Sequence, residues 1–121
     1  MKHNFLNLEI WKKSCRLVKK IYQKTSSFPS EEKFGLTSQI RRCSVSVPSN
    51  IAEGCGRGTD SQLIHFLDVA IGSLCELETQ IYLSYDLEFL SKENKNELVE
   101  EVTSIRKMTA SFQENLRKQI K

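Results

Sequence analysis

Residues 59–81, TDSQLIHFLDVAIGSLCELETQI, carry the pattern that decides the fold. Apolar residues recur along this stretch at intervals of four and three: Leu63, Leu67, Ala70, Leu74, Leu77 and Ile81. Because an α-helix has about 3.6 residues per turn, this spacing places them on one face, like the packing seam of a coiled coil. Thr59 and Gln62 form a capping box before the seam, so the sequence predicts a helix over 60–89.

This predicted helix carries further apolar residues that lie off the seam: Phe66, Ile71, Tyr82 and Tyr85. They predict a second buried face in addition to the seam. Either a wider core or contact with another subunit accounts for such a face.

Two other segments show the same helical periodicity. A stripe of apolar residues predicts a helix over 8–26, with Asn7 as its N-cap and Leu6 and Trp11 as a hydrophobic staple around that cap. A second stripe, following Ser91, predicts a helix over 92–119 whose remaining faces are strongly charged.

The fourth predicted helix spans 31–53. Glutamates in its first turn suit the positive end of the helix dipole. Gly35 weakens the early part, so the regular helix is expected to start as late as Leu36. Three short connections between four long helices force neighbouring helices to be antiparallel. The sequence therefore predicts an all-α fold, an up-down-up-down antiparallel four-helix bundle, with residues 1–121 as a single domain.

The stretch SVPSNIAEGCGRG at 46–58 holds one of the two prolines and three of the five glycines. It lacks the lysine and serine or threonine of a Walker loop, and it misses the third glycine of a dinucleotide-binding loop. Its glycines predict the end of one helix and a turn into the next. Arg57 is expected either to hold an anion at the N-terminus of the next helix or to pair with a carboxylate.

Pro48 falls inside a predicted helix, where it removes a hydrogen bond and kinks the backbone. Small and polar residues around it allow a second helix to approach closely. We therefore expect an oligomer interface or helix-packing face at Ser46, Pro48, Asn50, Glu53 and Gly54.

Catalytic and metal sites find little support. A di-iron bundle needs paired Glu-x-x-His motifs, but only His3 and His65 are present and Gln62 stands three residues before His65. We expect no catalytic residues, no metal site and no cofactor. The four cysteines lie far apart, which favours thiols at helix interfaces over disulfides or zinc ligands. Neither a long apolar run nor a signal-peptide pattern is seen, so we expect a cytoplasmic protein without a membrane partner.

The charge is unevenly distributed. Residues 1–58 hold eleven Lys or Arg against four Asp or Glu, whereas 59–121 hold seven against eleven. Either the halves attract each other, within or between chains, or a basic face binds a polyanion. The candidate phosphate-binding residues are Lys12, Arg16, Lys19, Lys20, Arg41, Arg42 and Arg57.

The stretch GLTSQIRRCSVSVPSNIAEG at 35–54 resembles the signature of four-helix bundle proteins encoded in intervening sequences of bacterial 23S ribosomal RNA genes. LEIW at 8–11 and FLDVAIGSLCELE at 66–78 also match, while Cys43 replaces the usual alanine and Cys55 separates two glycines. The resemblance implies a ring-shaped homopentamer, and it implies no enzymatic activity. It also implies an architecture similar to the accessory protein of diversity-generating retroelements, which binds nucleic acid and a reverse transcriptase.

Two functions follow as hypotheses. The first is a non-enzymatic, homo-oligomeric protein that binds RNA or DNA through the basic face. The alternative is a protein-interaction scaffold, for example a partner of a reverse transcriptase, without direct nucleic-acid binding. In the alternative, Arg41 and Arg42 would pair with carboxylates such as Glu53, Glu76 or Glu78.

Overall fold

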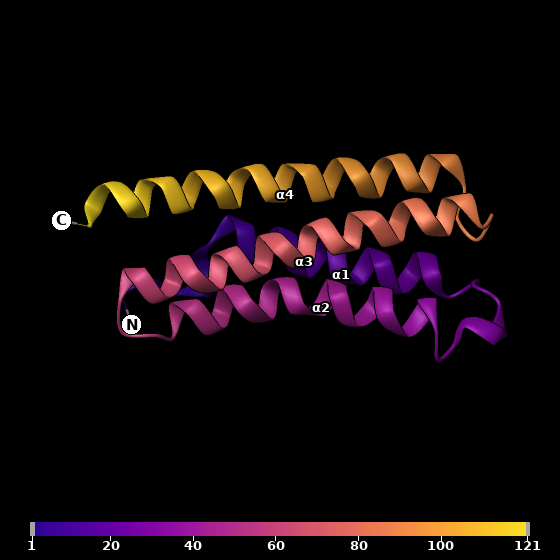
Figure 1. Ribbon diagram of the computed structural model, residues 1–121, viewed down its shortest axis with the longest axis horizontal. Helices are drawn as coiled ribbons and strands as arrows, with labels where there is room; N and C mark the ends of the chain where they lie inside the picture. The colour runs from indigo at the N-terminus through magenta and orange to yellow at the C-terminus, as the bar shows by residue number, and fades with distance from the viewer. Residues whose placement is uncertain (1, 121) are drawn as a thin grey trace.

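Four α-helices run side by side in the computed structural model, which describes residues 2–120 (Figure 1). They are α1 (Glu9–Thr25), α2 (Leu36–Cys55), α3 (Asp60–Asp86) and α4 (Lys92–Gln119), with short 3-10 helices η1 (Phe5–Asn7) and η2 (Ser30–Glu32) before α1 and α2. Each helix packs against the next in the chain, and α4 packs back against α1. Both termini and the α2–α3 turn lie at one end of the bundle (Figure 1). The predicted up-down-up-down four-helix bundle is confirmed.

The seam of α3 forms the centre of the core. Its six apolar residues are each no more than 1% exposed. They pack with the buried stripes of the other helices, which include Leu17, Ile40, Val47 and Ile105. Burying an aliphatic side chain of this size stabilises the fold by about 1.5–3 kcal/mol. Of the off-seam residues, Tyr82 is exposed and the others are half-buried, so the second face is only partly covered.

The start of α1 differs from the prediction. Asn7 lies inside η1 and does not cap α1, whose N-cap is Leu8 without a side-chain hydrogen bond. Asn4 performs the capping instead, because its Oδ1 accepts a hydrogen bond from the Leu6 amide at the start of η1. The predicted staple is also wrong, since Trp11 packs edge-on against Phe5 while Leu6 is 53% exposed.

The second helix begins at Leu36 rather than at 31, as the weak position at Gly35 suggested. The ψ angle of Gly35 is −118°, outside the helical region, and the Leu36 amide donates to the Glu32 side chain over 3.1 Å. The helix then continues through Pro48 to Cys55. Near Pro48, a side chain forms a hydrogen bond with the backbone of the helix: Asn50 Nδ2 donates to the Ser46 carbonyl over 2.7 Å.

Gly54 allows α2 and α3 to approach closely. A Cβ atom at this position would lie 2.9 Å from both Leu63 Cδ1 and Phe66 Cβ, closer than carbon atoms pack. The turn then leads to Thr59, whose side chain accepts a hydrogen bond from the Gln62 amide and caps α3 as predicted.

The third helix ends at Asp86, three residues before the predicted position. Glu88 adopts a left-handed conformation with φ of 66°. The amides of Glu88 and Phe89 donate to the carbonyls of Tyr85 and Ser84, which is the hydrogen-bond pattern of a Schellman motif. The apolar periodicity of the sequence extends past the end of the helix, because Phe89 still packs inward, against the ring of Phe28. The last helix spans the predicted residues and is capped by Ser91.

Candidate nucleic-acid interface

Three of the predicted phosphate-binding residues share one outward face of α1. Lys12, Arg16 and Lys19 are spaced four and three residues apart, opposite the buried residues Leu17 and Ile21. Arg16 and Lys19 are exposed, and neither forms an ion pair within residues 2–120. Lys12 reaches Glu9 only at 3.9 Å. We call Lys12, Arg16 and Lys19 the α1 stripe.

Lys20 points away from the α1 stripe, toward α4. Its Nζ lies 3.0 Å from Glu101 Oε2 and 3.1 Å from Glu97 Oε1. Lys24 reaches the other oxygen of Glu97 over 3.1 Å. Hydrogen bonding to Glu101 and then Glu97 raises the pKa of Lys20, while Lys24 and then Lys20 lower the pKa of Glu97. The charge of Lys20 is therefore neutralised within the bundle.

Arg41 is held by α1. Its Nε donates to Thr25 Oγ1 over 2.9 Å, and its terminal nitrogen donates to the Tyr22 carbonyl over 3.3 Å. The guanidinium carbon also lies 4.7 Å from the centre of the Tyr22 ring. These contacts join α2 to the C-terminal end of α1 and use two of the guanidinium's nitrogens within the chain.

Arg57 pairs with a carboxylate, which is one of the two roles that the sequence predicted for it. Its guanidinium lies 2.9 Å from Glu53 Oε2 and 4.9 Å from the centre of the Phe66 ring. The N-terminus of α3 already carries a negative charge, because Asp60 stands there and contacts Lys2 and His3. The α2–α3 turn thus consists of paired charges.

Arg42 is exposed and lies away from the α1 stripe, in a hollow between α2 and α3 that also contains Ser46 and Glu76. The structure therefore brings Lys12, Arg16 and Lys19 together and separates Arg42 from them. Lys13 was not among the predicted site residues, although it stands three residues from Arg16. Both side chains line a hollow of about 100 Å³ beside Glu101 of α4.

The predicted interface residues divide into two groups. Pro48 and Gly54 are buried and pack within the chain. Ser46 and Asn50 are half-buried and bond to the backbone of their own helix, while the exposed Glu53 pairs with Arg57. Only Ser46, Asn50 and Glu53 thus have surface that another molecule can reach.

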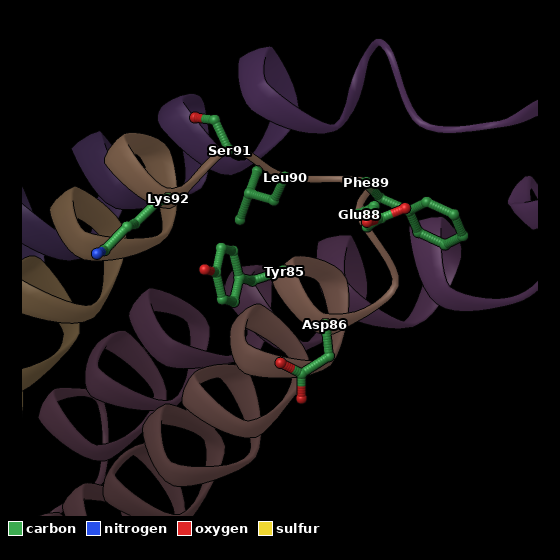
Figure 2. Close-up of a pocket in the computed structure, with 7 residues that line it drawn as sticks. All are labelled: Tyr85, Asp86, Glu88, Phe89, Leu90, Ser91 and Lys92. Atoms are coloured by element: carbon green, nitrogen blue, oxygen red, sulfur yellow. The ribbon is translucent and has the colours of Figure 1, made fainter.

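A hollow with a volume of about 620 Å³ lies at the α3–α4 turn (Figure 2). The side chains of Tyr85 and Leu90 point into the same space, with Lys92 at its edge, whereas Asp86 points away (Figure 2). The lining residues run only from Tyr85 to Lys92 and include no histidine or cysteine. Among these residues, no nucleophilic side chain is paired with a base, as covalent catalysis would require.

The described part of the chain contains no group of three His, Cys, Asp or Glu side chains placed to hold a metal ion. All four cysteines are free. Cys43 and Cys55 are buried at helix interfaces as predicted, and burial raises the pKa of the Cys43 thiol to about 12. For Cys75 the prediction is wrong, because it is exposed.

Comparisons with known proteins agree with this fold. The family described as 23S rRNA-intervening sequence protein matches residues 6–111. A crystal structure of a protein with unknown function, from the S23 ribosomal protein family of Bacteroides thetaiotaomicron VPI-5482, aligns with a TM-score of 0.80 and 24% sequence identity. The alignment covers 87% of this chain and 95% of that one. No curated protein matches the chain. Over residues 2–120, no helix is long and apolar enough to cross a membrane.

Proposed function

The chain belongs to the 23S rRNA-intervening sequence protein family, and from this premise we propose that it is a non-enzymatic, homo-oligomeric bundle that binds RNA or DNA through the α1 stripe. One observation carries the proposal: Lys12, Arg16 and Lys19 remain outward-facing while the adjacent Lys20 and Lys24 are neutralised by carboxylates of α4. Arg16 and Lys19 form no ion pair within residues 2–120, and a line of such cations suits a polyanion.

The α1 stripe suits phosphates rather than bases. Its seven-residue span corresponds to about 10 Å of helix, enough to contact successive phosphates. It contains no aromatic side chain on which a base would stack, and its groups are flexible cations. Contacts of this kind fix the position of the nucleic acid and carry little sequence information.

Assembly would strengthen this binding. A homo-oligomer, for which a five-subunit ring is the expected form, presents one α1 stripe per subunit, so that one nucleic-acid chain would contact several stripes at once. Exposed apolar residues support assembly, because Phe34 is 89% exposed and Leu83 and Leu87 are about half exposed. We place this protein in the cytoplasm, where free thiols such as Cys75 persist.

The second candidate is a scaffold that docks a protein, such as a reverse transcriptase, without touching nucleic acid. It is favoured by the contacts of Arg41 and Arg57, which are used within the chain instead of facing a ligand. It accounts less well for the α1 stripe, because Arg16 and Lys19 form no ion pair within residues 2–120.

Charge reversal of the α1 stripe separates the two functions. The triple variant Lys12→Glu, Arg16→Glu, Lys19→Glu is compared with Lys92→Glu, Lys107→Glu, Lys118→Glu, a control on α4 that changes the net charge equally. If the stripe binds phosphates, only the first variant loses affinity for RNA and DNA while keeping the wild-type mass. Equal affinities of the two variants would favour the scaffold.

A further inference from the structure

A second surface lies between α2 and α3, where a hollow of about 320 Å³ opens to solvent. We call it the α2–α3 groove. It is lined by polar side chains and one thiol, from Gln39, Arg42, Cys43, Ser46, Glu76 and Gln80.

Gln80 is the unusual member of the groove. It is only 7% exposed, yet its Oε1 accepts no hydrogen bond from any residue between 2 and 120. The side chain of the other buried glutamine, Gln113, does have partners, because its Nε2 donates to the Ile64 carbonyl over 3.0 Å and to Asp68 over 2.7 Å. A buried amide without a partner costs about 1–3 kcal/mol, so Gln80 is expected to find its partner on another molecule.

The groove also carries one charge of each sign. Arg42 and Glu76 stand on its two helices, both are exposed, and neither forms an ion pair among the described residues. The neighbouring Arg41 and Arg57, by contrast, are both engaged within the chain. Both charges are therefore available to an occupant of the groove that carries a cation and an anion.

Apolar surface continues from the groove along α3. Val69, Glu76 and Leu83 recur every seven residues and so lie on one face of the helix. Val69 and Leu83 are 39% and 47% exposed. Gly72 lies on the same face, and a Cβ there would meet no atom within 4 Å. Another backbone can therefore approach this face closely.

We propose that the α2–α3 groove, with the face of α3 that carries Val69, Glu76 and Leu83, is the surface on which a second copy of this chain docks. The inference rests on the homo-oligomeric part of the proposed function and locates its interface. The neighbouring copy supplies a hydrogen-bond donor to Gln80 Oε1, a carboxylate to Arg42 and a cation to Glu76. A nucleic acid is a poor occupant, because its phosphates would be repelled by Glu76 and would not cover the apolar side chains.

The test uses reversals of exposed charges, which leave the core intact. Arg42→Glu and Glu76→Arg are compared with Lys107→Glu and Glu100→Arg, two exposed positions of α4 without ion pairs among the described residues. Light scattering gives the molar mass, and far-ultraviolet circular dichroism gives the helix content. We expect each groove variant to dissociate toward the 14.0 kDa chain with unchanged helix content. Because like charges facing each other across an interface cost several kcal/mol, the dissociation constant should rise at least about tenfold. The α4 controls should keep the wild-type mass.

A third variant, Gln80→Leu, keeps the volume and removes the unpartnered amide. It is expected to weaken assembly without lowering the melting temperature of the dissociated chain. Groove variants that keep the wild-type mass would overturn the inference, and so would loss of RNA binding at unchanged mass, which would assign the groove to nucleic acid. A monomeric wild type would also overturn it. Phosphate binding by the α1 stripe is decided separately, by the RNA assay of its own variants.

Discussion

Arg41 of α2 donates a hydrogen bond from Nε to the hydroxyl of Thr25, the last residue of α1, over 2.9 Å. The same hydroxyl donates to the Ile21 carbonyl over 2.7 Å. A chain of hydrogen bonds thus joins α2 to the C-terminal turn of α1. The next residue, Arg42, takes no part in it and faces the α2–α3 groove. Two consecutive arginines therefore have different roles, one within the chain and one at its surface.

Replacing Arg41 should cost stability rather than affinity. Arg41→Ala removes hydrogen bonds from a charged donor and leaves the Tyr22 carbonyl without it, so the free energy of unfolding is expected to fall by about 1–2 kcal/mol. Arg42→Ala is the matched control and should change it by less than about 0.5 kcal/mol in the dissociated chain. Urea unfolding followed by circular dichroism measures both. Equal effects of the two substitutions would contradict the assigned roles.

Gly54 should tolerate no side chain. A Cβ would lie 2.9 Å from atoms of Leu63 and Phe66, so Gly54→Ala must push α2 away from α3. Overpacking of this kind typically costs about 1–3 kcal/mol. Gly58→Ala provides the control, because no atom lies within 4 Å of its Cβ position. Thermal unfolding of both variants checks the prediction, and a fully stable Gly54→Ala variant would argue against the close approach of the helices.

Replacing Glu88 with glycine should increase the stability of the fold. Its φ of 66° is a left-handed conformation that glycine adopts without steric conflict. Glu88→Gly relieves about 1–2 kcal/mol of steric strain and costs about 0.5–1 kcal/mol in backbone entropy, so we expect a net gain in stability of about 0.5–1 kcal/mol. Glu93→Gly, in the first turn of α4, should destabilise instead. Denaturant midpoints distinguish the two, and a loss of stability in Glu88→Gly would contradict the role of this residue.

Acid should weaken the contact between α1 and α4. Hydrogen bonds from Lys24 and then Lys20 lower the pKa of Glu97 from its ordinary 4.5. Because the folded chain holds this proton less tightly than the unfolded chain, the stability from Glu97 is complete above that ordinary pKa. It is lost as pH falls through the lower folded pKa. The free energy of unfolding should therefore decline less steeply with acid in Glu97→Gln than in the wild type. Glu100→Gln is the control, and an identical acid dependence in Glu97→Gln would count against the pairing.

The fold was predictable because a single periodicity runs through each helix. The seam from Leu63 to Ile81 specifies a buried face whatever its neighbours are, and Thr59 and Ser91 cap their helices with local hydrogen bonds. Helix starts that depend on several short turns were less predictable. Asn7 has a good capping side chain, but η1 shifts the start of α1 beyond it.

The candidate site was less predictable than the fold. The sequence identifies seven candidate cations, but it does not say which of them contact a carboxylate or a carbonyl in the folded chain. Lys20 pairs with residues of α4 that lie 77 and 81 positions away in the chain. Arg41 reaches a hydroxyl 16 positions away. Such pairings depend on tertiary structure, so only the spacing of Lys12, Arg16 and Lys19 could be read from the sequence.

The central claim is that the α1 stripe binds phosphates, and the salt dependence of RNA binding tests it most directly. The three phosphate contacts of a single stripe predict that wild-type affinity for a mixed-sequence RNA falls at least roughly 20- to 40-fold between about 50 and 200 mM salt, and contact with several stripes of an oligomer makes the fall steeper. The triple variant of Lys12, Arg16 and Lys19 should bind weakly at both salt concentrations, and the α4 control should follow the wild type. A wild-type affinity that ignores salt, or a triple variant that binds as tightly as the wild type, would contradict the claim.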